Sequence, residues 1–202
     1  MKYILPAVVF FFSVSVFAGK PIPPLPPKLQ VLFDAIKDTG VNYKPDGAVC
    51  EQVVILQMQQ SFPADHYALT SGVEYDVGDG TVGELDLVVV NKGTQHVELV
   101  GEVKCWHDFS AAMDKAKMQR DRFMWHLTQF ANKINFTAHN ADFKFTENNF
   151  HGLEKFIFIS QMGGVRKGFD VEIPYNLGEM QQLQDALVRC QNSGRCPLDK
   201  AH

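Results

Sequence analysis

Residues 83–106 read GELDLVVVNKGTQHVELVGEVKCW. Two segments rich in Val and Leu, 83–91 and 97–106, flank a turn at 91–94 that contains Asn, Lys, Gly and Thr. Apolar runs of this length on either side of turn-forming residues are typical of a β-hairpin. We therefore expect two adjacent strands here, with the other elements of the chain arranged around them.

Four charged side chains lie on these two strands. Because successive side chains of a strand point to opposite faces, Glu84 and Asp86 share one face of the first strand. In the same way Glu102 and Lys104 share one face of the second. If the two faces coincide, three carboxylates and one ammonium group converge, and such crowded oxygen ligands favour Mg²⁺ or Mn²⁺. The alternative is a hairpin whose charged residues face solvent and form modest cross-strand pairs.

The pattern Gly83-Glu84-x-Asp86 followed by Glu102-x-Lys104 resembles the signature of the PD-(D/E)XK nuclease superfamily, and in detail its branch of Holliday-junction-resolvase-like proteins. The resemblance covers roughly residues 50–160. It implies an α/β (α+β) fold with a restriction-endonuclease-like core, a mixed central sheet flanked by helices in the order αβββαβ. It also implies metal-dependent hydrolysis of phosphodiester bonds in DNA, or in RNA.

The same resemblance implies a role for each charged residue. Asp86 and Glu102 would ligate Mg²⁺ or Mn²⁺ together with the main-chain carbonyl of Val103. Lys104 would orient the attacking water and offset the charge that grows in the transition state. Glu84 would serve a second metal or the outer shell of the first, as would Glu51 on an earlier helix.

Hydrophobic periodicity predicts the remaining elements. Apolar residues three and four positions apart indicate helices, and apolar or alternating runs bounded by turn residues indicate strands. The predicted helices are 29–38, 48–62, 110–134 and 177–191, the further predicted strands are 67–77, 154–160 and 171–174, and a polar surface loop is predicted at 137–151. From 48 to 160 this gives a helix, three strands, a helix and a strand, which is the order that the resemblance implies.

Glu51 lies on the apolar face of the predicted helix 48–62. An acid in that position is costly unless it has a partner. Near the start of a helix its charge is favourable with the helix dipole and is partly solvated. The second interpretation is that the carboxylate points at the cation site, and the sequence leaves both interpretations open.

The predicted helix 110–134, capped by Ser110 or Asp108, carries Gln119 within its buried stripe. Gln119 and Phe123 resemble a Gln-x-x-x-Tyr element of some exonuclease branches of the superfamily, although Phe replaces Tyr. On that resemblance Gln119 positions substrate or water. A core glutamine hydrogen-bonded to a neighbouring strand is the alternative.

The same helix holds the densest group of basic residues in the chain. We expect these residues to bind the phosphates of the nucleic acid. They are Lys115, Lys117, Arg120 and Arg122. Because Asp114 and Asp121 interleave with them, an ordinary solvated helix face is the alternative.

The N-terminus differs in kind from the rest. Residues 1–18 combine Lys2, an apolar run and small residues before a cleavage site after Ala18, which predicts a secretory signal peptide. Residues 19–28 are rich in proline and predict an extended linker rather than a helix. We expect residues 29–202 to form one exported domain, periplasmic or secreted, with no stable membrane association after cleavage.

Four cysteines remain after cleavage, an even number in an oxidising compartment, and they allow two disulfides in three connectivities. The local pair Cys190–Cys196 is the simplest bridge and leaves Cys50 to pair with Cys105. Alternatively, Cys105 is a buried free thiol. The spacing does not fit a zinc site.

The net charge of −4, about −5 once Lys2 is removed, argues against tight nonspecific binding to duplex nucleic acid. It does not exclude a nuclease, because local charge matters more than the total. Two other classes stay open. One is a nuclease-like fold that binds nucleic acid or a protein without catalysis, and the other is a disulfide-stapled exported interaction protein unrelated to nucleic acids.

Overall fold

The computed structural model describes residues 24–78, 80–138 and 143–198. Within these ranges it is a mixed α/β fold with four α-helices, α1 Pro27–Ile36, α2 Ala48–Met58, α3 Phe109–Gln129 and α4 Leu177–Asn192. The strands are β1 Tyr67–Thr70, β2 Val73–Asp76, β3 Thr81–Leu85, β4 Leu87–Asn91, β5 Val97–Lys104, β6 Asn135–Ala138, β7 Phe156–Ser160 and β8 Val171–Glu172. Two short 3₁₀ helices, η1 Glu147–Phe150 and η2 Val165–Lys167, complete it.

Five strands form the main sheet, in the order β1-β4-β5-β7-β8. The predicted hairpin is confirmed as β4 and β5, which pair antiparallel. At its turn the Asn91 side chain accepts hydrogen bonds from the main-chain N–H groups of Gly93 and Thr94. β7 pairs parallel with β5, because α3 carries the chain back across the sheet. The predicted mixed sheet is therefore present.

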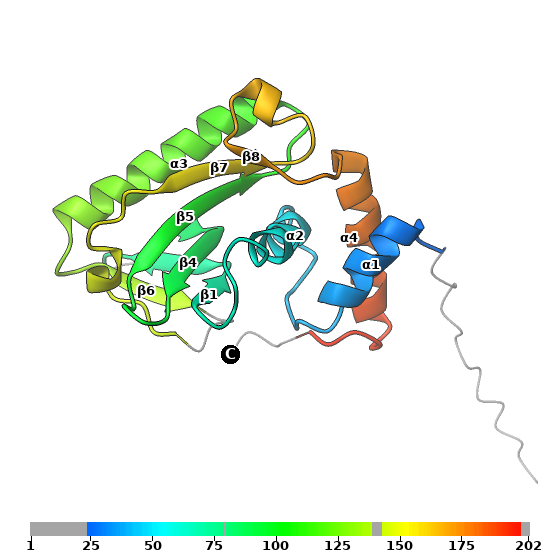
Figure 1. Cartoon of the computed structure of the whole chain (residues 1–202), viewed down its shortest axis with the longest axis horizontal. Coiled ribbons are helices and arrows are strands. Elements are labelled where there is room, and N and C mark those ends of the chain that lie inside the picture. Colours follow the sequence, from blue (N-terminus) through cyan, green and yellow to red (C-terminus); the bar gives the residue numbers. More distant parts are fainter. Residues whose placement is uncertain (1–23, 79, 139–142, 199–202) are drawn as a thin grey trace, which may run out of the picture.

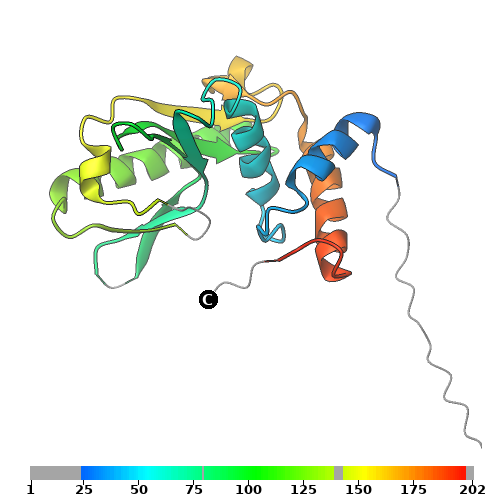
Figure 2. The ribbon, with the colours of Figure 1, turned by 60° about the horizontal axis from the view of Figure 1, so that its bottom comes forward.

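Two predicted strands are each broken in two. Segment 67–77 contains β1 and β2, separated at Gly72, whose φ of +67° favours glycine. Segment 83–91 is divided at Asp86 into the end of β3 and β4. β2 and β3 leave the main sheet and join β6 in a second, three-stranded sheet. Figure 2 shows the β2–β3 hairpin extending away from the main sheet.

The predicted polar loop 137–151 was wrong in part, because the described residues at its start lie in β6, which pairs with β2. Phe145 and Phe150 within it are buried. The segment reads as polar in the sequence because these two aromatic residues stand among Asn and Thr residues and form no apolar pattern. The preceding helix α3 ends at Gln129 instead of 134, because Phe130 leaves helical geometry (φ −124°, ψ 29°).

Helix starts and ends follow local chemistry. Asp108, and not Ser110, caps α3: its side chain accepts from the N–H groups of Ser110 and Ala111. α1 begins at Pro27, so the last two residues of the predicted linker 19–28 are helical; proline is tolerated at the first helical position.

The predicted signal peptide 1–18 lies outside the described residues. No helix in the described part combines the length and apolar character needed to cross a membrane.

Helices cover both faces of the main sheet (Figure 1). α2 packs on one face, with α1 and α4 behind it, around buried residues that include Leu87, Leu99 and Val103. α3 and the three-stranded sheet cover the opposite face, where Phe123 packs with Val88. The side chains of β5 therefore alternate between two different buried environments.

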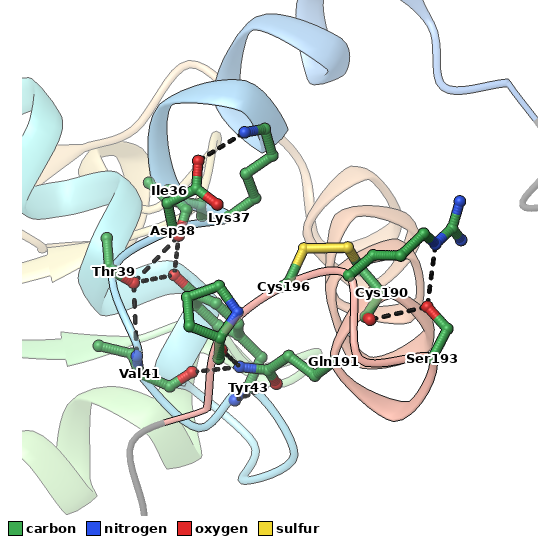
Figure 3. The surroundings of a disulfide bond; sticks show 12 residues. Ile36, Lys37, Asp38, Thr39, Val41, Tyr43, Cys190, Gln191, Ser193 and Cys196 are labelled. Carbon is green, nitrogen blue, oxygen red and sulfur yellow. Dashed lines mark hydrogen bonds and ion pairs between the residues drawn. A yellow bond between two sulfur atoms is a disulfide. The ribbon is translucent and has the colours of Figure 1, made fainter.

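The predicted pair Cys190–Cys196 is confirmed, and so is Cys50–Cys105, so Cys105 is not a free thiol. Figure 3 shows the surroundings of the C-terminal bridge. Next to it, Gln191 donates to the carbonyl of Val41 at 2.6 Å and accepts from the N–H of Tyr43. The end of α4 is thereby joined to the loop between α1 and α2. Cys50–Cys105 joins α2 to the segment that follows β5.

We expect the double substitution Cys50→Ala/Cys105→Ala to lower the free energy of unfolding more than Cys190→Ala/Cys196→Ala. The bridged residues are 55 positions apart in the first pair and 6 in the second. In the chain-entropy account the stabilisation grows with loop length, which gives about 4 and about 2 kcal/mol. Urea denaturation of the oxidised proteins measures both. A larger loss from the C-terminal pair would contradict the expectation.

Candidate functional site

Asp86, Glu102 and Lys104 meet on one face of the main sheet. In the β4–β5 pairing Leu87 lies opposite Gly101, which places Asp86 beside Glu102. The Lys104 Nζ lies 2.8 Å from Asp86 Oδ2 and 2.6 Å from Glu102 Oε1. All three side chains are buried, with Glu102 only 1 % exposed. The convergence expected from the hairpin pattern is therefore present, whereas a solvent-facing charged hairpin is not.

The main chain of β5 contributes to the same group. Asp86 Oδ2 accepts a hydrogen bond from the N–H of Val103 at 2.8 Å. The Val103 carbonyl, predicted to be a metal ligand, accepts one from Lys104 Nζ at 3.1 Å. These bonds fix both the carboxylate of Asp86 and the ammonium of Lys104 against a strand that is itself paired on two sides.

Glu51, in the first turn of α2, faces this group. Burial first, and then the negative charges of Asp86 and Glu84, raise its pKa well above the usual range. Glu102 and Lys104 also act on it. Glu51 thus lies at the start of the helix, as the first interpretation expects, and also within reach of the charges of Asp86, Glu102 and Lys104.

Glu84 does not share a strand face with Asp86, contrary to expectation. The chain passes from the second sheet to the main sheet between them, so the alternation of a single strand does not apply. Glu84 is exposed on β3, opposite Glu74 of β2. Its charge nevertheless acts on Glu51, so it lies at the edge of the same acidic group.

The charges of this group are unbalanced. Burial, followed by the charge of Asp86, raises the pKa of Glu102 to about 8. Burial alone would lower the pKa of Lys104, but Asp86 and Glu102 outweigh it and raise that pKa. Lys104 therefore stays protonated. One ammonium group faces several carboxylates, and a further cation would relieve their repulsion.

The donor set suits a hard cation, since all of its ligand atoms are oxygens. In the described residues no group of three or more His, Cys, Asp or Glu side chains is arranged to hold a metal ion. The position of Lys104 gives a physical reason, because its ammonium already bonds Asp86 and Glu102. Those two residues would hold a divalent ion, with Glu51 as a further carboxylate nearby.

Helix α3 places polar groups over the same face of β5. Gln119 Oε1 and Arg122 Nε are buried, and no hydrogen-bond partner for either lies in the described residues. Arg122 also hydrogen-bonds the side chain of Tyr75, and burial, helped by the charge of Glu102, raises the pKa of the Tyr75 hydroxyl. Gln119 and Arg122 thus have unused bonding capacity on α3.

Nothing in the sequence around Tyr75 marks it as a site residue, because it reads as one residue of an alternating strand. Gly83 could have indicated it, since Gly83 pairs with Tyr75 between β2 and β3. A Cβ atom at position 83 would lie 2.5 Å from the Tyr75 hydroxyl oxygen. Glycine is therefore needed there for the tyrosine to reach Arg122.

The four predicted phosphate-binding residues do not form one surface. Lys115 and Arg122 lie on the helical stripe of Gln119, seven positions apart. Lys117 and Arg120 lie on another side of α3. Arg120 pairs with its neighbour Asp121 and packs over the ring of Phe158. Only the first pair shares the helical stripe of Gln119.

Comparison of the chain with models of protein families, with curated proteins and with solved structures found no match. The site is therefore interpreted from its own residues and geometry.

We expect the metal-free protein to lose stability as pH rises from about 5 to about 8. In this window native Glu102, with a pKa of about 8, keeps a proton that unfolded Glu102, with a pKa near 4.5, has lost. Through Glu102 the free energy of unfolding then falls by at most about 1.4 kcal/mol per pH unit, and Glu51, whose pKa is raised as well, adds to the slope. Glu102→Gln should reduce this slope in urea denaturation with EDTA. The control is Glu98→Gln, an exposed acid of the same strand, which should keep it. Equal slopes in wild type and Glu102→Gln would refute the assignment.

Proposed function

We propose that this protein is an exported nuclease that hydrolyses phosphodiester bonds of nucleic acid, DNA in the first instance, with Mg²⁺ or Mn²⁺. The observation that carries the proposal is the buried contact of Lys104 Nζ with both Asp86 and Glu102. These residues belong to the pattern that resembles the PD-(D/E)XK superfamily. The succession α2, β1, β4, β5, α3 and β7 supports a restriction-endonuclease-like core, with β2 and β3 as an addition.

Each residue has a defined task in this proposal. Asp86 and Glu102 hold the metal, which when bound polarises water and neutralises charge on the phosphate. Lys104 stays protonated and so acts as a donor: it orients the attacking water and stabilises the negative charge that grows on the phosphate oxygens. Binding of the metal requires the proton of Glu102 to leave, so activity should rise with pH below about 8.

Gln119 and Arg122 supply contacts to substrate. The buried Arg122 Nε–H needs an acceptor, which a phosphate oxygen or a water would provide. The buried Gln119 Oε1 needs a donor, which a water would provide. Glu51 and Glu84 add negative charge that favours a second ion or the hydration shell of the first. Lys115 lies on the same side of α3, where it would contact the nucleic-acid strand that leaves the site.

Export is consistent with the two disulfides, which persist in oxidising compartments.

A second candidate function is a nuclease-like fold that binds nucleic acid or a protein without cutting. It is favoured by the hydrogen bonds that Lys104 donates to both Asp86 and Glu102, because they use carboxylate oxygens that a cation would need. The net charge of −4 favours the third class, an interaction protein unrelated to nucleic acids.

We expect the mature protein to cut DNA when Mg²⁺ or Mn²⁺ is present, and EDTA to stop it. Asp86→Asn and Lys104→Ala should each reduce the rate by at least about 100-fold, because each removes a group that acts on the reacting atoms. Glu98→Gln serves as the control, since it is exposed on the same strand. Thermal melts establish that each variant is folded. Plasmid DNA, linear single strands and RNA should be assayed side by side.

The outcomes separate the candidates. Undiminished cutting by both folded variants would refute the site assignment. Binding of nucleic acid without cation-dependent cutting would favour the inactive nuclease fold. Absence of both metal binding and nucleic-acid binding at low salt would favour the interaction protein.

A further inference from the structure

A cavity of about 430 Å³ lies where β5 ends, beside the Cys50–Cys105 disulfide. Its walls come from the start of α2, from the segment between β5 and α3, and from α4. Its volume falls within the range of about 300–1,000 Å³ that is usual for small-ligand sites. Trp106 lines it, and this side chain is 42 % exposed.

The backbone that carries Trp106 is held at three consecutive residues. The buried Ser160 hydroxyl donates to the carbonyl of Lys104 at 2.7 Å. Cys105 is fixed by its disulfide. The Gln161 amide, also buried, donates to the carbonyl of Trp106 at 2.7 Å. Buried polar groups thus hold rigidly a segment whose tryptophan is open to solvent, which is the arrangement of a preorganised aromatic contact.

The cavity adjoins the charged site through two neighbours in sequence. Lys104 directly precedes the lining residue Cys105, and Cys50, bonded to Cys105 and also in the lining, directly precedes Glu51. At the rim, a Cβ atom on Gly47 would lie 3.4 Å from Glu51 Oε1. A ligand bound in this cavity would therefore lie close to Glu51, on which the charges of Asp86, Glu102 and Lys104 act.

The residues that line the cavity favour binding of a neutral, planar group rather than a phosphate. Asp46 and Asp108 both line the cavity, and their charges would repel a phosphate. Trp106 offers a ring for stacking, and His107 and Gln181 offer polar groups for the edge of a heterocycle. A nucleobase has both features, a stacking face and a hydrogen-bonding edge.

We propose that Trp106 stacks on an unpaired nucleobase that enters this cavity while the neighbouring phosphate lies at Lys104. The inference rests on the proposed function and narrows its substrate to single-stranded nucleic acid or unpaired segments. In a duplex the base would first have to leave its stack and its partner, which costs free energy. The acidic net charge agrees with recognition through a base rather than through many phosphates.

The chain has two tryptophans, so each can be observed alone. Trp125→Phe leaves Trp106 as the fluorescent reporter, and Trp106→Phe leaves Trp125, an exposed residue of α3. The probe is an oligothymidylate of about 12 nucleotides, inside the range of known single-strand sites. It is titrated at low salt with Ca²⁺ in place of Mg²⁺, and gels check that it stays intact. We expect fluorescence quenching in the first variant and none in the second.

Affinity gives the second measurement. Trp106→Ala should weaken binding of the single strand about 5- to 150-fold, the loss expected for one stacked base. Trp106→Phe should retain most of the affinity, and Trp125→Ala should leave it unchanged. Wild type should bind the single strand more tightly than a duplex of the same length.

The two proposals fail in different ways. Unchanged affinity and cutting in Trp106→Ala, or quenching of Trp125 instead of Trp106, would overturn the base site and leave the nuclease proposal standing. Absence of single-strand binding by the wild type would also overturn the base site. Stacking on Trp106 without any cutting in Mg²⁺ would support the base site and refute the nuclease.

Discussion

The buried ammonium of Lys104, held between Asp86 and Glu102, is the interaction on which the arrangement of this protein depends. Three buried ionisable side chains are tolerated only when each has a partner, because an isolated charge in an apolar interior is very costly. The pairing requires the end of β3, the start of β4 and the end of β5 to meet within hydrogen-bonding distance. The hairpin between β4 and β5 brings the last two together, and the N–H of Val103 fixes the orientation of Asp86.

The surrounding elements hold this point from several directions. β7 pairs with β5 through the register Lys104 to Ser160, and the Ser160 hydroxyl bonds the Lys104 carbonyl. The Cys50–Cys105 disulfide attaches α2, and with it Glu51, to the residue after Lys104. The polar positions of β5 thus lie where a sheet pairing, a disulfide and a helix come together. Such support from neighbouring groups is what a site needs if its geometry is to be kept when charges change.

The sequence predicts the parts of this protein whose signals are local. The alternation around the 91–94 turn identifies the hairpin, and the periodicity of 177–191 identifies α4 within one residue at its end. It does not predict the break at Asp86, because Leu85 and Leu87 read as one alternating strand although they enter different cores. The same limit explains Glu84 and Tyr75: they lie in the β2–β3 hairpin, which leaves the main sheet and is joined by β6, more than fifty residues later. Long-range pairing of this kind leaves little trace in the pattern of a single strand.

The acidic balance of the chain constrains how nucleic acid could be bound. A protein that neutralises many phosphates gains affinity from released counterions, and such proteins are basic. This chain has a net charge of −4, and Arg120, one of its few basic residues on α3, is paired with Asp121. On the proposed function, affinity must then come from contacts that do not require positive charge: a divalent ion shared between carboxylates and phosphate, and stacking of a base on Trp106. The second contact needs an accessible, unpaired strand, since the faces of a stacked and paired base are covered by its neighbours. On the two proposals, the charge of the protein and the exposed Trp106 therefore favour the same substrate, a single strand bound at one nucleotide.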